Sequence, residues 1–234
     1  MPRLDPKAIY SQQTKQLTIT EKRLLQRKKL LSWSRFFSLI ISFIAIWQIW
    51  PVGIALAFAS FILLFGLFLF TVVQDQKNND EIENVRLLIQ INKKELKILS
   101  YLFTDFPDGQ HLKPEHHAYA NDLDIFGKAS IYQYINRTTS EQGNRVLADW
   151  LLNPAESTVI LQRQDAAKEL SMQTEWRHQL QAHGITKQIT ITAENKIENW
   201  LKSKNKFLEN ITWKIVRVLF PIITLTVLAL HITD

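Results

Sequence analysis

The stretch from Phe36 to Val73, FFSLIISFIAIWQIWPVGIALAFASFILLFGLFLFTVV, decides the fold, because its 38 residues contain no Asp, Glu, Lys or Arg. At ~1.5 Å per residue, one straight helix of this length is nearly twice as long as a bilayer core is thick. Pro51 and Gly53 interrupt the helical pattern within Trp50-Pro51-Val52-Gly53, so the sequence predicts a hairpin of two short transmembrane helices. A buried hairpin in a soluble domain needs a large surrounding core, which the remaining residues hardly supply.

The composition of the whole chain excludes several protein classes. Its 234 residues are enough for one or two domains, and 46% hydrophobic against 21% charged residues do not describe a disordered chain. The absence of cysteine excludes a disulfide scaffold, a thiolate nucleophile and a Cys-ligated metal site. We predict a mainly α protein with five parts: a basic N-terminal helix (1–35), the transmembrane hairpin (36–73), a long amphipathic connecting helix (74–106), a helical domain (107–213) and a third transmembrane segment (214–234).

The net charge of +6 is distributed unevenly. Residues 1–35 carry nine Lys and Arg against two acids, whereas residues 74–213 carry seventeen against nineteen. The excess lies next to the first predicted span, in Lys22, Arg23, Arg27, Lys28, Lys29 and Arg35. The positive-inside rule then places the N-terminus and residues 74–213 in the cytoplasm, as in a multi-pass protein of a bacterial-type inner membrane. A topology signal explains these cations most simply, and attraction to anionic lipid is the alternative.

A third apolar run, Val218–Thr233, contains no formal charge if His231 is neutral. It is short for a full span and carries Pro221 near its start, and we interpret it as a third membrane segment. Five cations before it favour a cytoplasmic start: Lys202, Lys204, Lys206, Lys214 and Arg217. Four tryptophans lie near the ends of the predicted spans, where the membrane interface favours them: Trp33, Trp47, Trp50 and Trp213.

Two patterns predict long helices on either side of the hairpin. The capping-box pattern of Thr18-Ile-Thr-Glu21 predicts a helix that begins near residue 19 and continues into the first span. After the hairpin, apolar residues alternate spacings of three and four around one polar position: Ile82, Val85, Ile89, Asn92, Leu96, Leu99 and Phe103. This stripe either pairs with a second copy as a coiled coil or packs within its own chain, and its short length favours the chain itself. Phe106-Pro107-Asp108-Gly109 is expected to end the helix.

The remaining cytoplasmic part is predicted to be mainly α. Alternation of Leu123 and Ile125 with Asp122 and Asp124 predicts one short strand. A second capping-box pattern, Thr139-Ser-Glu-Gln142, precedes a helix whose apolar face (Val146, Leu147, Trp150 and Leu151) is expected to be buried and which ends at Asn153-Pro154. Three more helices are predicted over 157–172, 174–183 and 192–204, with Trp150 buried against the first of them.

Clusters of chemically active residues are few. The densest set of possible metal ligands is His111, His116, His117, Asp105, Asp108, Glu115, Asp122 and Asp124, but no spacing among them matches a zinc pattern, which favours a solvated loop. Arg137, Arg145, Arg163 and Lys168 can contact phosphate, although ion pairs with Asp149, Asp165 and Glu169 are the simpler role. No glycine pattern forms a phosphate-binding loop, and no catalytic, cofactor-binding or metal residue is assigned.

Several segments nevertheless share an order and spacing with one protein family. They are Asp122-Leu-Asp-Ile-Phe-Gly127, Ser130-Ile-Tyr-Gln-Tyr-Ile-Asn-Arg-Thr138, Gly143-x-Arg145 and Ala148-Asp-Trp-Leu-Leu-Asn-Pro154, followed by Ile160, Arg163-Gln164 and Glu169-Leu170. Together they resemble the start of the core, or lever, domain of the MutS family of DNA mismatch-repair ATPases. The match is best with a membrane-bound branch, in which a hairpin, a long polar helix and a loop like Phe106–Gly109 and His117-Ala-Tyr-Ala120 precede the same segments. The resemblance covers roughly residues 75–210.

The resemblance implies a MutS-type helical core on a membrane anchor. Members of the family carry a C-terminal ATPase domain that binds ATP with Mg²⁺ and dimerises, and these 234 residues contain none of its motifs. No catalytic or nucleotide-binding residue can therefore be carried over. We expect this chain to be the front part of a longer protein that returns through a fourth span, and not to hydrolyse ATP alone.

Two functions from different classes follow as expectations. The first is the membrane-anchored core segment of a MutS-related protein, with the lipid bilayer as partner, weak DNA binding at most, and homodimer formation through the ATPase domain. The alternative is a membrane-tethered scaffold or adaptor that binds proteins without DNA or ATP. A transporter is poorly supported, because residues 36–73 contain no ionisable residue that marks a conduction path.

Overall fold

The computed structural model describes residues 5–49, 51, 53–188, 190–203 and 211–233. The chain divides into two compact units, Met1–Gln188 and Ile189–Asp234. Every regular element within the described residues is a helix, so the predicted mainly α fold class is confirmed.

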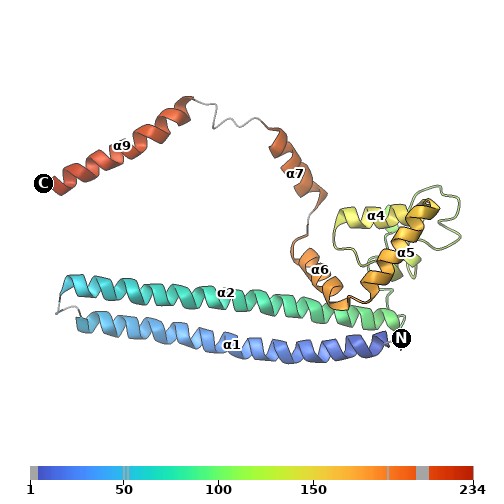
Figure 1. Ribbon diagram of the computed structural model, residues 1–234, viewed down its shortest axis with the longest axis horizontal. Coiled ribbons are helices and arrows are strands. Elements are labelled where there is room, and N and C mark those ends of the chain that lie inside the picture. The colour runs from blue at the N-terminus through green and yellow to red at the C-terminus, as the bar shows by residue number, and fades with distance from the viewer. Residues whose placement is uncertain (1–4, 50, 52, 189, 204–210, 234) are drawn as a thin grey trace. The chain divides into compact units, whose positions relative to one another are not determined.

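The predicted hairpin consists of two long helices, α1 (Pro6–Ile49) and α2 (Ile54–Leu99), which lie side by side in Figure 1. Both are long and apolar enough to cross a membrane. In the most apolar part of α1 no side chain is buried, unlike the core helix of a soluble domain. The break falls at Pro51 and Gly53 as predicted, while Trp50 and Val52 lie outside the described residues.

The predicted helix start near residue 19 is wrong, because residues 18–21 lie inside α1. The helix begins at Pro6, where Asp5 Oδ1 accepts a hydrogen bond from the Lys7 backbone N–H (3.0 Å). Thr18 Oγ1 instead donates to the carbonyl of the residue four positions earlier (2.7 Å), a bond typical of threonine within a helix. The sequence pattern resembles a capping box, but the Thr18 hydroxyl bonds to a carbonyl within the helix and does not cap its first turn.

The heptad stripe of α2 packs within its own chain, as predicted. Ile82, Val85 and Ile89 are at most 9% exposed and form a buried cluster with Leu24 of α1. Burying one such side chain is worth about 1.5–3 kcal/mol relative to leaving it exposed. This cluster therefore holds together the charged halves of the two helices, residues 6–35 and 74–99, which we call the polar arm.

The connecting helix ends at Leu99, seven residues before Phe106, so its predicted end is wrong. The chain leaves the helix through Tyr101, whose φ of 57° is left-handed. The Tyr101 N–H donates to the Ile98 carbonyl (3.0 Å), and the Leu102 N–H donates to the Lys97 carbonyl (2.9 Å). These two bonds form a Schellman motif, in which glycine is the usual left-handed residue. Because tyrosine stands in that place, the helix end carries no glycine that could mark it in the sequence.

Residues 100–188 form a small helical cluster at the end of the polar arm. Its helices are η1 (Gln110–Leu112), α3 (Ile131–Ile135), α4 (Glu141–Leu152), α5 (Ser157–Ser171) and α6 (Thr174–Thr186). The predicted helices over 157–172 and 174–183 are thus present to within three residues. α6 packs on α2 through Ala182, which is fully buried with Leu88 and Ile91.

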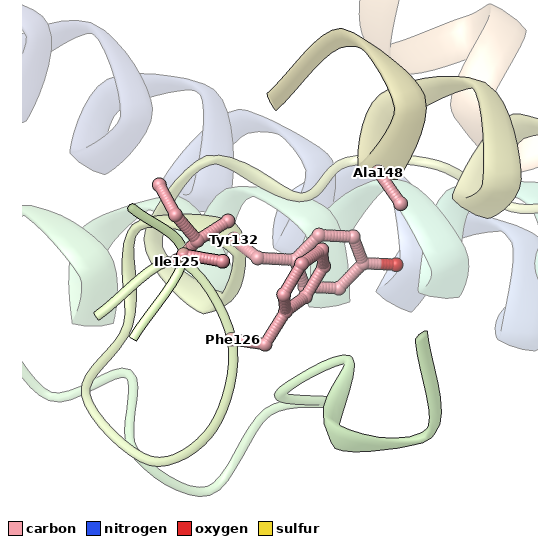
Figure 2. Close-up of a cluster of buried hydrophobic side chains, with 5 residues drawn as sticks. Ile125, Phe126, Tyr132 and Ala148 are labelled. Carbon is pink, nitrogen blue, oxygen red and sulfur yellow. The ribbon is translucent and has the colours of Figure 1, made fainter. Parts of the chain in front are cut away.

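The core of this helical cluster comes from a loop, a short helix and α4. Figure 2 shows Ile125, Phe126, Tyr132 and Ala148 converging, each at most 6% exposed. The predicted strand around Leu123 and Ile125 is wrong, because the chain turns there: the Ile125 N–H donates to the Ala120 carbonyl (3.1 Å). The turn buries two adjacent residues, Ile125 and Phe126, whereas a strand would place neighbouring side chains on opposite faces. The alternation of polar and apolar residues therefore had another cause.

α4 begins one residue later than the predicted capping box, at the Ser140 N-cap, whose Oγ accepts from the Gly143 N–H (3.0 Å). It ends before Asn153 as predicted. The expected burial of this face is wrong at Val146 and Trp150, whose side chains are 48% and 50% exposed. Ala148 supplies the buried contact instead, and the Arg163 guanidinium of α5 lies 3.9 Å from the centre of the Trp150 ring.

The second unit contains two helices, α7 (Ile191–Lys202) and α9 (Ile211–Thr233). α7 corresponds to the helix predicted over 192–204, and Thr190 Oγ1 caps it by accepting from the Ala193 N–H (3.2 Å). The apolar run Val218–Thr233 is helical within α9 and includes Pro221. Lys204 and Lys206 lie outside the described residues, and the crossing of a membrane by α9 stays a prediction.

Gly109 is a sharp test of the helical cluster, because it has a φ of +69° and a Cβ there would lie 2.6 Å from Tyr132 Cδ1. We expect Gly109→Ala to cost at least about 1–3 kcal/mol, from left-handed backbone strain plus overlap. The measurement is hydrogen exchange of the amides in 120–152 in the full chain in detergent. Gly66→Ala is the matched control, since nothing lies within 4 Å of its Cβ. Equal protection in both variants would contradict the described packing.

Candidate functional site

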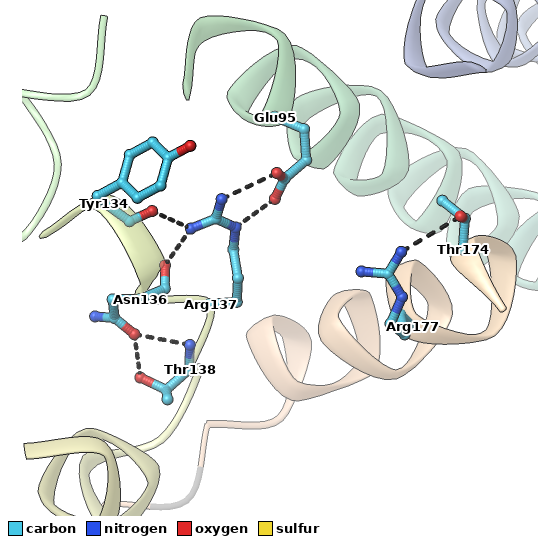
Figure 3. Close-up of polar contacts among 7 residues, drawn as sticks. All are labelled: Glu95, Tyr134, Asn136, Arg137, Thr138, Thr174 and Arg177. Carbon is cyan, nitrogen blue, oxygen red and sulfur yellow. Dashed lines mark hydrogen bonds and ion pairs between the residues drawn. The ribbon is translucent and has the colours of Figure 1, made fainter. Parts of the chain in front are cut away.

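A bidentate ion pair joins the helical cluster to α2. Arg137, which follows α3, donates from Nε to Glu95 Oε1 (2.5 Å) and from Nη2 to Glu95 Oε2 (3.0 Å). Its Nη1 also donates to the carbonyls of Tyr134 (2.7 Å) and Asn136 (3.3 Å), as Figure 3 shows. The pair is bidentate and partly shielded, with side chains 32% and 13% exposed, so it is stronger than an open surface ion pair.

Short hydrogen bonds fix the backbone around Arg137. Asn136 Oδ1 accepts from the N–H (2.8 Å) and the hydroxyl (2.7 Å) of Thr138. Asn144 Oδ1 of α4 accepts from the Tyr132 hydroxyl (2.9 Å) and from Asn136 Nδ2 (3.3 Å). Core, loop and α4 are therefore linked to the residue that contacts α2.

A cavity of about 390 Å³ lies beside this ion pair. Its lining includes Glu95, Arg137, Ser140, Trp176, Arg177 and His178. Arg177 Nη2 donates to Thr174 Oγ1 (3.3 Å; Figure 3), whereas Arg177 Nε is buried without a hydrogen-bond partner among the described residues. Since Glu95 already pairs with Arg137, Arg177 leaves the cavity with one positive charge in excess.

His178 of α6 is buried between the helical cluster and the hairpin. It is 5% exposed, and its ring lies 5.6 Å from that of Tyr10 in α1. Burial lowers the pKa of His178 below 6.5, Glu95 acts in the opposite direction, and Arg177 lowers the pKa further. The imidazole is therefore neutral at pH 7, and α6 lies on the hairpin through an uncharged contact.

The loop that carries the possible metal ligands, for which a solvated loop was the favoured prediction, makes hydrogen bonds within the protein. His117 Nε2 lies 3.0 Å from the Leu152 carbonyl, and the Tyr119 hydroxyl donates to the same oxygen (2.6 Å). These bonds satisfy a carbonyl at the end of α4. Asp108 Oδ1 accepts from the Gln110 N–H (3.0 Å) in a turn. Within the described ranges, no three His, Asp or Glu residues come together to hold a metal ion.

The four cations considered as phosphate ligands (Arg137, Arg145, Arg163 and Lys168) were expected to pair with nearby acids, and two of them have other neighbours. Arg137 pairs with Glu95 rather than with Asp149, Asp165 or Glu169, while Arg163 covers Trp150. Asp149 Oδ1 accepts from Asn153 Nδ2 (2.7 Å) at the end of α4. Arg145 and Lys168 are exposed. The structure therefore brings none of these four cations to a shared phosphate site.

Polar contacts also cross the polar arm near the apolar stretch. Arg35 pairs with Asp75 (3.0 Å), whose side chain is 9% exposed, and Asn78 Nδ2 donates to the Leu24 carbonyl (3.1 Å). Sequence reasoning missed both, although Asp75 and Asn78 continue the spacing of three and four that leads to Ile82. Polar residues in register with an apolar stripe were the available signal.

The comparisons with known proteins return no match: no family model, no curated protein and no solved structure matches the chain. The resemblance to the MutS family therefore rests on the segments quoted above.

The Glu95–Arg137 pair should contribute measurably to stability. In a double-mutant cycle of Glu95→Gln and Arg137→Gln, we expect a coupling energy of at least about 1 kcal/mol, since both partners are charged and shielded. The measurement is the free energy of urea unfolding of the full chain in detergent. The same cycle on Arg27 and Glu81, a pair at 3.9 Å that is 50% and 56% exposed, should give less than about 0.5 kcal/mol. Equal coupling energies for the two pairs would contradict the shielded contact between Arg137 and Glu95.

Burial of neutral His178 should make stability depend on pH. Because its folded pKa is lowered, the unfolded chain binds the proton more readily, so stability is fully present above pH 6.5 and is lost as pH falls below it. We expect His178→Gln to flatten this dependence in thermal unfolding between pH 7.5 and 5. His183→Gln, which changes an exposed histidine on the same helix, should leave the slope unchanged. A slope that survives in His178→Gln contradicts the assignment.

Proposed function

We propose that this chain is the membrane-anchored core, or lever, segment of a MutS-related protein, and that it works with an ATP-binding domain of that family. In this proposal the hairpin holds the protein in the bilayer, and the helical cluster passes movement between the ATPase domain and the hairpin. Support comes from the quoted segments, whose residues Ile125, Phe126, Tyr132 and Ala148 are the buried core of the helical cluster.

The observation that carries the proposal is the junction between α2 and the helical cluster. α2 runs without a break from the apolar stretch to Leu99, and Arg137 of a MutS-like segment binds Glu95 in its last two turns. Ala182 and His178 of α6 add a second, buried attachment to the hairpin. A cluster attached at two places to a continuous helix cannot turn without turning that helix, which is what a lever requires.

The proposed setting is a bacterial-type inner membrane, with the N-terminus and the helical cluster in the cytoplasm and α9 as a third span. It is supported by two helices long and apolar enough to cross a membrane and by the basic residues before the first. ATP and Mg²⁺ belong to the ATPase domain in this proposal, as does homodimer formation. DNA binding by residues 74–213 should be weak, because their charge is slightly negative.

A second candidate is a membrane-tethered scaffold that binds proteins without DNA or ATP. It is favoured by large apolar side chains exposed on the helical cluster, among them Trp150 (50%), Trp176 (51%) and Leu180 (59%). Such side chains are enriched where proteins meet. Both candidates thus predict a protein partner on this surface, and they differ in what that partner is.

Photocrosslinking separates the two. A photoreactive amino acid at Trp150 or Leu180 of the protein, expressed in its own cells, should crosslink to a G-x-x-x-x-G-K-[ST] ATPase domain of the MutS type, within the same longer polypeptide or in a second one. The yield should change when ATP is depleted, because a lever moves with its ATPase. The matched control is Leu102, which is 65% exposed but precedes the helical core. Crosslinks only to proteins without such a domain would favour the scaffold.

A further inference from the structure

The cations before the apolar stretch fall into two groups. Arg27 and Arg35 face acids across the polar arm, at 3.9 Å from Glu81 and 3.0 Å from Asp75. The others are exposed and belong to none of the ion pairs of the described residues: Lys22, Arg23, Lys28 and Lys29. Pairing within the hairpin thus accounts for only part of the basic excess.

One of the unpaired cations, Lys29, precedes a group of exposed aromatic side chains by about one helical turn. Trp33 contacts Phe36 and Phe37, with ring centroids 6.1 and 5.8 Å away, and all three are 52–58% exposed. At 3.6 residues per turn, Lys29 and Trp33 are about one turn apart on the side of α1 opposite Leu24, which faces α2. This side presents an ammonium group, an indole N–H and apolar rings in sequence toward the apolar stretch.

The four unpaired cations lie at two different distances from the start of the apolar stretch at Phe36. Lys29 precedes Phe36 by seven residues, about 10 Å, so its flexible stem can bring the ammonium to the headgroup layer of a bilayer that begins at Phe36. Lys28 lies at nearly the same level. Lys22 and Arg23 are about 20 Å from Phe36, roughly two Debye lengths or more at physiological salt, and beyond direct contact.

We propose that Lys29 and Trp33, with the exposed Lys28 at the same level about 100° around α1 from Lys29, bind the phosphate headgroups of anionic phospholipids, with Phe36 and Phe37 beside the acyl chains. This inference rests on the proposed membrane anchoring and adds a lipid preference to it. Nucleic acid is the less favoured occupant, because the phosphate-binding groups continue directly into exposed apolar rings. A lipid presents phosphate and hydrocarbon in the same order.

The test compares two double variants that each remove two adjacent positive charges. The full chain is reconstituted in phosphatidylcholine vesicles, and electron spin resonance measures how strongly spin-labelled phosphatidylglycerol associates relative to spin-labelled phosphatidylcholine. We expect a preference of at least about twofold for the wild type. Lys28→Gln/Lys29→Gln should bring the ratio close to one, whereas Lys22→Gln/Arg23→Gln should keep it.

Each other outcome decides against the proposal in a distinct way. If the two variants lower the ratio equally, net charge alone attracts the lipid and there is no local surface. If Lys28→Gln/Lys29→Gln keeps the ratio while motionally restricted lipid is still present, the surface is refuted but the membrane anchor stands. If no lipid is restricted, the anchor fails as well. If that variant loses only salt-dependent binding of a 30-base-pair DNA duplex, nucleic acid is the occupant.

Discussion

The packing of α1 against α2 in the polar arm is the interaction on which the rest of the first unit depends. Leu24 is buried against Ile82, Val85 and Ile89, and the next turns of α2 bury Leu88 and Ile91, against which α6 packs. The helical cluster is attached to side chains of this same part of α2. Without the α1–α2 contact, the face of α2 that receives the cluster would belong to a single exposed helix, which has little stability of its own.

The two halves of the hairpin are held by different means. Within the apolar stretch no described side chain is buried, and the half-buried positions of α1 include the small residues Ser38, Ser42 and Ala45. In the proposed membrane anchor, small residues would let the two helices approach closely where lipid removes any hydrophobic drive to associate. The hydroxyls of Ser38 and Ser42 donate to carbonyls of their own helix, which would satisfy them in hydrocarbon. Among the described side chains of the hairpin, a buried apolar seam is found in the polar arm.

Features that follow from the periodicity of apolar residues could be predicted from the sequence. Features that depend on a single contact between residues far apart in the chain could not. The charge-free stretch and the spacing of Ile82, Val85 and Ile89 were sufficient for the hairpin and its packing, because both follow from burial of whole faces. Glu95 with Arg137 and His178 with Tyr10 were not predictable, since each joins residues that come together only when the cluster is folded. The end of α2 was not predicted, because Tyr101 occupies the left-handed position where glycine is usual. Trp150 shows that an apolar helix face need not be buried when a small residue on the same helix, Ala148, makes the close contact.

These differences bear on how movement could pass through the molecule. The helical cluster is joined to α2 by a shielded bidentate ion pair and by buried side chains of α6, so it and the polar arm should move as one body. Among the described residues of the apolar half no side chain is buried, so a packed seam is absent there. Buried polar atoms without a hydrogen-bond partner among the described residues occur where the two halves meet, at Asp75 Oδ1 and Asn78 Oδ1, and also farther along the seam, at Asn92 Oδ1. In the proposed lever, movement of the cluster would pass to the polar arm, whereas the apolar half lacks the packing that would carry it further.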